Sequence, residues 1–559
     1  MAAKPAKKKI IRHTKDGIGY VNVVGADDEL KLAVSQTLSR HIGHYQVAEM
    51  EYDYALSSLV LHDNAILEAL ESHGYDVDKG VGANFFKLIE EYKEEMEAML
   101  GEKLKRGEIE FPDIPFLLKQ GSDAIAAMDG HAVAGHVESV ELKYSFMAGP
   151  FYQIKIKVIA NLDGAIGNEL YSANIFSWTG FMPVAQIGVR RATAEDKARL
   201  TERGRRFIKY ATGIQYCRYI GQIKRHSWYG VKSYRADGRV MVDLASFREI
   251  EDDQYRSEQR ASGIEGRDHY DDNASTQKQD MKVTEQDLWR CFPFLYGFSF
   301  KAKQWGRLDV ESITDIQFRD DSWDKLVLQE DKKALIRAIV EHQQGTFTDI
   351  VEDKGGGSIF LLHGPPGQGK TLTAETIAEI LHRPLYAISV GELGVSPDEL
   401  EERLRTILDL ATVWNAVLLL DEADIFLEAR DERDIVRNAM VGVFLRLLEY
   451  HQGVLFLTTN RVKNIDQAFY SRISIGLEFP AAEDEKRAKI WMNLLDAAEL
   501  LDNPIAKDDI DVLARHDLNG RQIKNVIRLA QTVAKSQNAE VSMAHLDEVI
   551  ALTGQFKKA

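Results

Sequence analysis

Hydrophobic residues change their spacing several times along this chain of 559 residues. Over residues 28–120 they recur at intervals of three and four, as in NFFKLIEEYKEEMEAMLGEKL, which predicts a helical N-terminal region. Over residues 121–247 they alternate with polar residues, as in VELKYSF and FYQIKIKVIA, around one helical stretch. We therefore expect a helical region followed by an α+β domain, and neither pattern by itself assigns a function.

Three other segments of the first 322 residues have a different character. Residues 1–27 contain many lysines and predict a basic flexible tail, with a nuclear-import signal or a nucleic-acid contact as the alternatives. Residues 248–282 hold few large apolar side chains, so they cannot bury enough surface to offset the entropy of ordering, which predicts a flexible linker. Residues 283–322 alternate again and predict a strand-rich connector.

Composition limits which partners this protein can bind and in which cell compartment we expect it. The formal net charge of -17 argues against a broad attraction to nucleic acid or to an anionic membrane. Cys217 and Cys291 are the two cysteines and cannot build a disulfide framework, which fits a reducing compartment. No apolar run of about 18 residues predicts a membrane span, and we expect an intracellular, soluble protein, cytoplasmic rather than nuclear.

The segment GSIFLLHGPPGQGKT carries the strongest chemical signal, in a region where strands and helices alternate from residue 323 onward. An apolar run leads into the pattern G-x-x-x-x-G-K-T, and a helix follows, which is the context that a phosphate-binding loop requires. Its backbone N–H groups would face phosphates, with a lysine to neutralise them and a threonine hydroxyl to hold Mg²⁺. The predicted ATP-binding residues are Gly364, Pro365, Pro366, Gly367, Gln368, Gly369, Lys370, Thr371 and Leu372.

Two later apolar strands end in polar residues that suit the same reaction. In AVLLLDEAD, Asp421 would bind Mg²⁺ together with Thr371, and Glu422 would polarise the attacking water. In VLFLTTN, Asn460 would orient water beside the γ-phosphate. These signals in this order predict an Mg²⁺-dependent ATPase.

This set of motifs resembles the AAA+ ATPase family over roughly residues 323–552, with GPPGQGKT as Walker A, VLLLDE as Walker B and TTN as the sensor-1 strand. The resemblance implies an α/β P-loop NTPase core over 323–480, in which a parallel sheet has helices on both faces, and a C-terminal helical lid over 481–559. It also implies that Arg472, in YSRIS, reaches the γ-phosphate of a neighbouring subunit. Arg521 matches a position that senses nucleotide within the subunit, and a solvated arginine at a helix start is the alternative.

The resemblance further implies a ring homo-oligomer, a hexamer in most relatives, that remodels a protein client recruited by residues 1–247. A nucleotide-gated binding scaffold with little turnover is the alternative, followed by a nucleic-acid motor. Threading members carry an aromatic residue where SVGELGVSPDELEE offers Leu393 and Val395, so peptide threading is not predicted. Upstream stretches such as GFSFKAKQWG are similar to a subgroup that fuses a domain of unknown function to a single AAA module.

Overall fold

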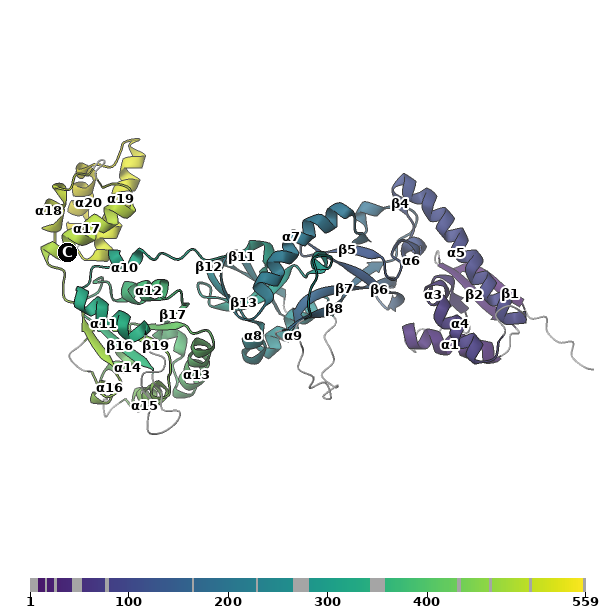
Figure 1. The fold of residues 1–559 in the computed structure, drawn as a ribbon, viewed down its shortest axis with the longest axis horizontal. Helices are drawn as coiled ribbons and strands as arrows, with labels where there is room; N and C mark the ends of the chain where they lie inside the picture. Colours follow the sequence, from purple (N-terminus) through teal and green to yellow (C-terminus); the bar gives the residue numbers. More distant parts are fainter. Residues whose placement is uncertain are drawn as a thin grey trace, which may run out of the picture. The chain divides into compact units, whose positions relative to one another are not determined.

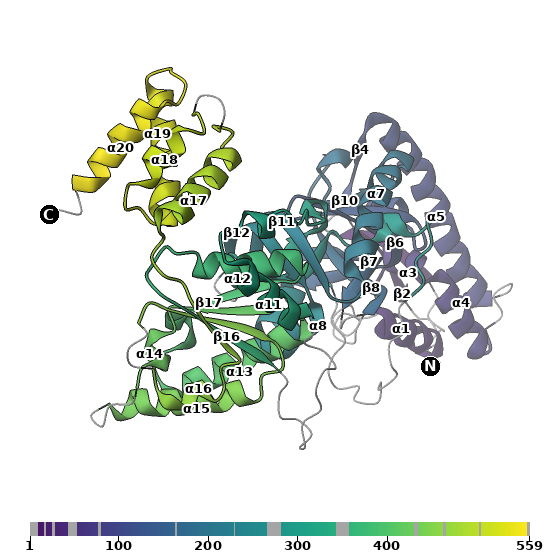
Figure 2. The same ribbon diagram turned by 60° about the vertical axis from the view of Figure 1, so that its left-hand side comes forward.

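The computed structural model divides into two compact units, residues 1–315 and residues 316–559, whose elements are labelled in Figure 1 and turned in Figure 2. Each unit contains its own buried apolar residues. Among the described residues, none of the helices is long and apolar enough to cross a bilayer. The described residues are 9–15, 18–24, 28–42, 53–75, 80–162, 165–227, 230–264, 281–341, 357–429, 434–461, 465–501 and 505–555.

The first unit begins with a small antiparallel sheet rather than a flexible tail. Strands β1 (Lys9–Lys15) and β2 (Ile18–Val24) pair along their whole length, and β3 (Asp53–Ala55) pairs with β2. The prediction of a flexible tail is therefore wrong for residues 9–15 and 18–24, where β-branched residues between the basic ones favour strand pairing, and the rest of 1–27 lies outside the described residues. The helices that follow are α1 (Asp28–Ile42), α3 (Leu56–Leu61), α4 (Asp63–Ser72), α5 (Gly80–Arg106) and α6 (Ile114–Leu117).

Two antiparallel five-stranded sheets form the rest of the first unit. The first has the order β10-β5-β6-β7-β8 and the second β12-β13-β14-β11-β15, while the short β4 (Glu108–Ile109) pairs with β9 (Met182–Pro183). Helix α7 (Ala194–Ala211) begins at a capping box on Thr193. The remaining strands are β5 (Asp123–Met128), β6 (His131–Ser145), β7 (Gly149–Leu162), β8 (Ala165–Phe176), β10 (Val189–Arg191), β11 (Gln215–Ser227), β12 (Gly230–Val242), β13 (Phe294–Ser299), β14 (Gln304–Asp309) and β15 (Ile313–Thr314).

The second sheet changes the interpretation of residues 248–322. Strands β13, β14 and β15 pair with β11 and β12, so the segment predicted as a connector completes this sheet instead. After α8 (Leu244–Ile250), helix α9 (Asp252–Ala261) occupies the start of the predicted linker, and residues 265–280 lie outside the described ranges. The linker prediction is wrong for α9, because Glu258 is fully buried and accepts hydrogen bonds from the backbone N–H and the ring Nδ1 of His226, at 2.5 and 2.8 Å.

The same sheet uses basic and aromatic residues that could have indicated a nucleic-acid surface. Arg225 donates to Glu251 at 2.6 Å, and His226 is paired with Glu258, so both are engaged by carboxylates of the same unit. Trp228 and Tyr229, which adjoin them in the sequence, lie outside the described residues. Arg225 and His226 thus have carboxylate partners within the unit, and the expectation about nucleic acid stays a prediction.

Gly204 lies where α7 packs closely against the backbone of Leu288, and a single substitution can test this contact. A Cβ at Gly204 would lie 2.1 Å from the carbonyl oxygen of Leu288, whereas a Cβ at Gly101 of α5 would have no atom within 4 Å. We expect Gly204→Ala to lower the free energy of unfolding by about 1–3 kcal/mol because the backbone must move apart. Gly101→Ala is the matched control and should leave stability unchanged or raise it by up to about 1 kcal/mol. Denaturant unfolding of the full chain measures both, and equal midpoints would contradict the close contact.

The second unit contains a parallel sheet in the order β17-β18-β19-β16-β20, confirming the predicted fold class. Its three central strands, β18, β19 and β16, are buried apolar runs, as expected where helices cover both faces. They are β16 (Ser358–His363), β17 (Leu385–Ser389), β18 (Val417–Asp421), β19 (Val454–Thr459) and β20 (Ile475–Glu478). The helices are α10 (Ser322–Lys325), α11 (Glu330–Glu341), α12 (Lys370–Ile380), α13 (Pro397–Val413), α14 (Asp424–Leu427), α15 (Ile435–Glu449) and α16 (Gln467–Tyr470).

The helices after the sheet form a group with an apolar core of its own. Figure 2 draws these helices in yellow-green and yellow. Trp491 and Leu546 are fully buried in that core. The helices are α17 (Asp484–Ala497), α18 (Asp509–Ala514), α19 (Gly520–Ser536) and α20 (Met543–Gln555). They occupy the segment in which the resemblance implied a helical lid.

Candidate nucleotide-binding site

The predicted phosphate-binding loop joins the carboxyl end of β16 to the first turn of α12. Three of its glycines have positive φ angles: +142° at Gly364, +76° at Gly367 and +96° at Gly369, a region that other residues rarely adopt. A Cβ at Gly364 would also lie 2.1 Å from the carbonyl oxygen of Phe479. The loop can therefore keep this shape only with glycine at these positions. Of the other predicted residues, Pro365, Pro366 and Leu372 are exposed and Gln368 is partly buried.

Lys370 is buried at the start of α12 and folds back over the loop. Its ammonium donates to the carbonyl oxygens of Gly364 and Pro365 at 2.7 and 2.9 Å, and to Oδ1 of Asn460 at 2.8 Å. Burial lowers the pKa of Lys370, and the carboxylates of Asp421 and Asp424 oppose that shift. The predicted phosphate-binding lysine and the predicted sensor asparagine are thus in direct contact.

Thr371, in the first turn of α12, lies beside Asp421 at the carboxyl end of β18. The Thr371 hydroxyl donates to both carboxylate oxygens of Asp421, at 3.2 and 3.3 Å. Oxygen donors of this kind, one hydroxyl and one carboxylate, are those that Mg²⁺ prefers, and it keeps several waters when it binds. The pair therefore fits the predicted magnesium site.

Thr458 is a site residue that the sequence did not reveal. Its hydroxyl donates to Oδ1 of Asp421 and accepts the backbone N–H of Glu422 at 3.0 Å, while its carbonyl accepts the N–H of Ala423 at 2.9 Å. Glu422 has a φ of +55°, a strained conformation for a residue with a side chain, and these bonds hold it there. The Glu422 carboxylate is exposed, as access to water requires. The only sequence signal was that Thr458 precedes Asn460 by two positions in TTN.

Asn460 is positioned by Asp424, a second residue that sequence reasoning missed. Oδ1 of Asp424 accepts the backbone N–H of Asn460 at 3.1 Å and the hydroxyl of Thr459. Asp424 is the last residue of the DEAD stretch and begins α14. The two polar strand ends of β18 and β19 are therefore tied to each other as well as to Lys370.

The start of α19 contacts the phosphate-binding loop. Gly520 donates its N–H to the carbonyl of Gly367 at 3.1 Å, and the Asn519 side-chain amide donates to the carbonyl of Pro366 at 3.3 Å. Arg521 follows immediately, and its charge contributes to the lowered pKa of Lys370. The structure thus places Arg521 within electrostatic reach of the loop, although its side chain is exposed.

Arg472 lies apart from this group, just after α16. Its guanidinium donates to Oε2 of Glu449 at 3.1 Å and to the carbonyl of Ala468 at 3.0 Å. In the described residues it has no contact with the phosphate-binding loop, Asp421, Glu422 or Asn460 of its own chain. Arg472 is thus held by α15 and α16 of its own chain.

The segment that corresponds to a gripping loop contains one exposed apolar side chain. Leu393 is fully buried, whereas Val395 is 84% exposed. Oγ of Ser396 caps α13 by accepting the N–H of Glu399, at 3.3 Å, as the sequence SPDE predicts. Leu393 is thus a core residue, and Val395 alone faces solvent here.

Comparison with known proteins identifies an ATPase domain in the second unit. The family model of the "ATPase family associated with various cellular activities (AAA)" matches residues 360–481. The human ATPase family AAA domain-containing protein 3B is 31% identical over 193 residues, which are 33% of this chain and 29% of that protein. A putative 26S proteasome regulatory subunit homolog of Methanothermobacter thermautotrophicus is 27% identical over 235 residues, 40% of this chain and 62% of that protein. The chain thus spans less than two thirds of the length of these relatives.

Among solved structures, the ADP complex of the FIGL-1 AAA domain has a TM-score of 0.33 and 22% identity, covering 41% of this chain and 82% of that one. The family model does not extend upstream of residue 360, so the resemblance of the first unit to a domain of unknown function stays a prediction. Residues 360–481 contain the loop after β16 and the strands β18 and β19, which the sheet places side by side in the order β18-β19-β16. The chain therefore contains an AAA ATPase domain, which the family model matches over residues 360–481.

Proposed function

We propose that this protein hydrolyses ATP in an Mg²⁺-dependent reaction, within a ring of identical subunits, and uses the reaction to remodel a protein or protein complex. The observation that carries the proposal is the convergence of Lys370, Asn460, Thr371 and Asp421 at the carboxyl ends of β16, β18 and β19. Ligands of open α/β sheets bind at this edge. Together these residues supply a cation, an amide that can orient water, and oxygen ligands for a metal ion at the same edge of the sheet.

Each residue of the site has a separate task in this reaction. The loop N–H groups and Lys370 would bind the phosphates, exchanging the bonds that Lys370 now makes to loop carbonyls. Thr371 and Asp421 would hold Mg²⁺, which supplies charge neutralisation at the phosphate oxygens. Glu422 would accept a proton from the attacking water, and Asn460 would orient that water. Phosphoryl transfer needs this positioning and charge stabilisation rather than a covalent intermediate.

The remaining two residues, Arg521 and Arg472, receive their proposed tasks from their positions relative to the loop. Arg521 follows Gly520, which is bonded to the loop, so the charge and position of α19 would respond to nucleotide in the same subunit. Arg472 would act on the nucleotide of the neighbour, since it does not reach its own. A ring, a hexamer by family resemblance, provides that neighbour for every subunit.

A protein client is the best-supported type of substrate. The relatives include the proteasome regulatory subunit homolog and an ATP-dependent zinc metalloprotease FtsH of Lachnoclostridium phytofermentans, whose names describe protein-processing systems. The exposed Val395 supplies no aromatic group to grip a threaded chain, so we propose remodelling through recruitment by the first unit. The scaffold alternative differs in one respect, because a binding switch does not need the water-activating carboxylate of Glu422.

Nucleotide binding should depend on the Lys370 ammonium. We expect Lys370→Ala to weaken binding of a non-hydrolysable ATP analogue roughly 10- to 100-fold, since a hydrogen bond to a charged group contributes about 1.5–3 kcal/mol. Calorimetric titration of the full chain in the presence of Mg²⁺ measures the dissociation constant. Lys332→Ala removes an exposed lysine of α11 in the same unit and should not change the affinity. Equal affinity for the Lys370 variant and the wild type would overturn the assignment of the loop.

A further inference from the structure

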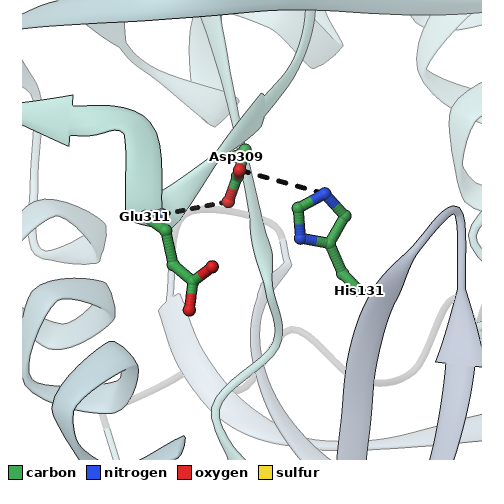
Figure 3. Close-up of side chains that lie close together, drawn as sticks. All are labelled: His131, Asp309 and Glu311. Atoms are coloured by element: carbon green, nitrogen blue, oxygen red, sulfur yellow. Dashed lines mark hydrogen bonds and ion pairs between the residues drawn. The ribbon is translucent and has the colours of Figure 1, made fainter.

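We propose that His131, Asp309 and Glu311 of the first unit form a binding site for a divalent transition-metal cation, with Zn²⁺ as the best match. Figure 3 shows the three side chains together, the His131 ring facing the Asp309 carboxylate. One ligand atom from each of them lies within 4.8 Å of the other two, and no other such group occurs in the described part of the chain. The site is remote in sequence from every residue of the ATPase machinery and does not depend on the proposed function.

The spacing between His131 and Asp309 suits an intervening cation better than direct contact. Nε2 of His131 is 3.8 Å from Oδ2 of Asp309, whereas a hydrogen bond between such groups has a length of about 2.7–3.2 Å. Zinc bonds to imidazole nitrogen and carboxylate oxygen are about 2.0–2.2 Å each. Two such bonds at an open angle span 3.8 Å, so the cation needs only small side-chain rotations.

The ligands are held in place by contacts that do not use up their metal-binding capacity. Oδ1 of Asp309 accepts the backbone N–H of Glu311 at 3.0 Å, and Oδ2 accepts the Ser312 hydroxyl at 3.3 Å, leaving other lone pairs of the carboxylate unused. The His131 ring packs edge-on against Phe294, with 4.9 Å between centroids. Bonds of this kind orient the ligands of known metal sites.

The neighbouring turn also fixes His131 in space. Asp129, two residues earlier at the tip of the β5–β6 hairpin, has a φ of +50° and accepts a hydrogen bond from the buried Arg307 of β14. The hairpin of the first sheet is therefore attached to the strand that ends in Asp309. A cation bound by His131 and Asp309 would add a second link between the two sheets of this unit.

The two carboxylates of the site have no direct counter-ion from lysine or arginine among the described residues. Within the described ranges, neither Asp309 nor Glu311 forms a salt bridge with lysine or arginine, and the Glu311 carboxylate makes no hydrogen bond. Arg203 is a buried cation whose charge interacts with Glu311 and Asp309, but its guanidinium donates to the carbonyls of Ala132 and Cys291 rather than to either carboxylate. Arg206 likewise donates to the backbone carbonyl of Glu311, at 3.0 Å, and not to its carboxylate. The side chains of His131 and Asp309 are 24% and 20% exposed, so an ion can enter from solvent.

The donor set determines which cation fits. One imidazole nitrogen with two carboxylates is a combination found for zinc, with water in the remaining position. Mg²⁺ prefers oxygen ligands alone and dehydrates reluctantly, so it should compete poorly. The selectivity separates this site from the one proposed at Thr371 and Asp421.

His136 supplies a matched control on the same strand. It forms a direct pair with Asp123, at 2.7 Å from Nδ1 to Oδ1, and Lys197 supplies the counter-charge. Another carboxylate does not complete a metal-binding group there within the described residues. His136→Gln therefore removes a histidine–aspartate pair of similar exposure without removing a proposed ligand.

The experiment is a calorimetric titration of the untagged full chain with ZnCl₂, in excess MgCl₂ so that magnesium sites are filled. We expect one zinc site per wild-type chain, weakened by at least about 10-fold in His131→Gln and in Glu311→Gln, and unchanged in His136→Gln. Asp309 is left intact because it caps the turn over Val310–Ser312. Zinc should also raise the melting temperature of the wild type and of His136→Gln, but not that of His131→Gln. Absence of zinc binding in the wild type, or equal affinity in the wild type and His131→Gln, would overturn the proposal.

Discussion

Replacing Arg472 with alanine should lower kcat for ATP hydrolysis by about 10³-fold or more while leaving nucleotide affinity nearly unchanged, because an arginine that stabilises the transferring phosphoryl group from a neighbour acts only in the transition state. The structure supports this separation. The guanidinium of Arg472 contacts Glu449 and Ala468 and not the nucleotide-binding residues of its own chain. Phosphate release gives kcat, and titration with a non-hydrolysable analogue gives the affinity.

The ion pair with Glu449 supplies the control for this prediction. Glu449→Gln breaks the same salt bridge but keeps the arginine, so activity should be retained. If Arg472 were only a structural partner of Glu449, both variants would lose activity together. That result would remove the assignment of Arg472 to the neighbouring site.

Mixing variants tests whether the arginine acts across a subunit boundary. A Lys370→Ala subunit cannot bind nucleotide well but still carries Arg472, and an Arg472→Ala subunit has an intact loop. Mixed rings should therefore recover part of the activity at interfaces that combine the two intact halves. Normal assembly of the mixture without recovery would contradict action between subunits.

The sequence could predict the parallel sheet and its loop because each strand carries its own signal. The apolar runs of β16, β18 and β19 are each followed by polar residues, and parallel strands bring such ends to one edge. Lys370, Asp421 and Asn460 could thus be assigned from their order alone. Their contacts agree with that assignment.

Residues that act through tertiary contacts could not be predicted in this way. In the sequence, Thr458 is indistinguishable from an ordinary strand residue. Its importance comes from the two hydrogen bonds that its hydroxyl makes to Asp421 and Glu422 at the end of the neighbouring strand β18. The stretch around Glu258 is too polar for its composition to predict a folded helix. The structure buries Glu258 against His226, which lies 32 positions away in the sequence. Local composition therefore predicted a flexible linker where the structure has α9. It also predicted a flexible tail where the structure has the β1–β2 hairpin, because that segment is rich in basic residues.

Substitution of Glu422, whose carboxylate is exposed, distinguishes an ATPase from a nucleotide-gated scaffold. Glu422→Gln keeps the size of the side chain and the backbone bond to Thr458 but removes the group that accepts a proton from water. We expect kcat to fall about 10²- to 10⁴-fold, with ATP affinity retained, as for loss of a general base. Asp424 begins the next helix and is unchanged in this variant, so the position of Asn460 should be preserved.

The most direct test is steady-state phosphate release by the wild-type chain and by Glu422→Gln, measured side by side with saturating ATP and Mg²⁺. The proposal of an Mg²⁺-dependent ATPase predicts continuous turnover by the wild type and a loss of at least about 100-fold in the variant. Equally slow release by both proteins, with ATP bound by both, would contradict the proposal and support a binding scaffold instead.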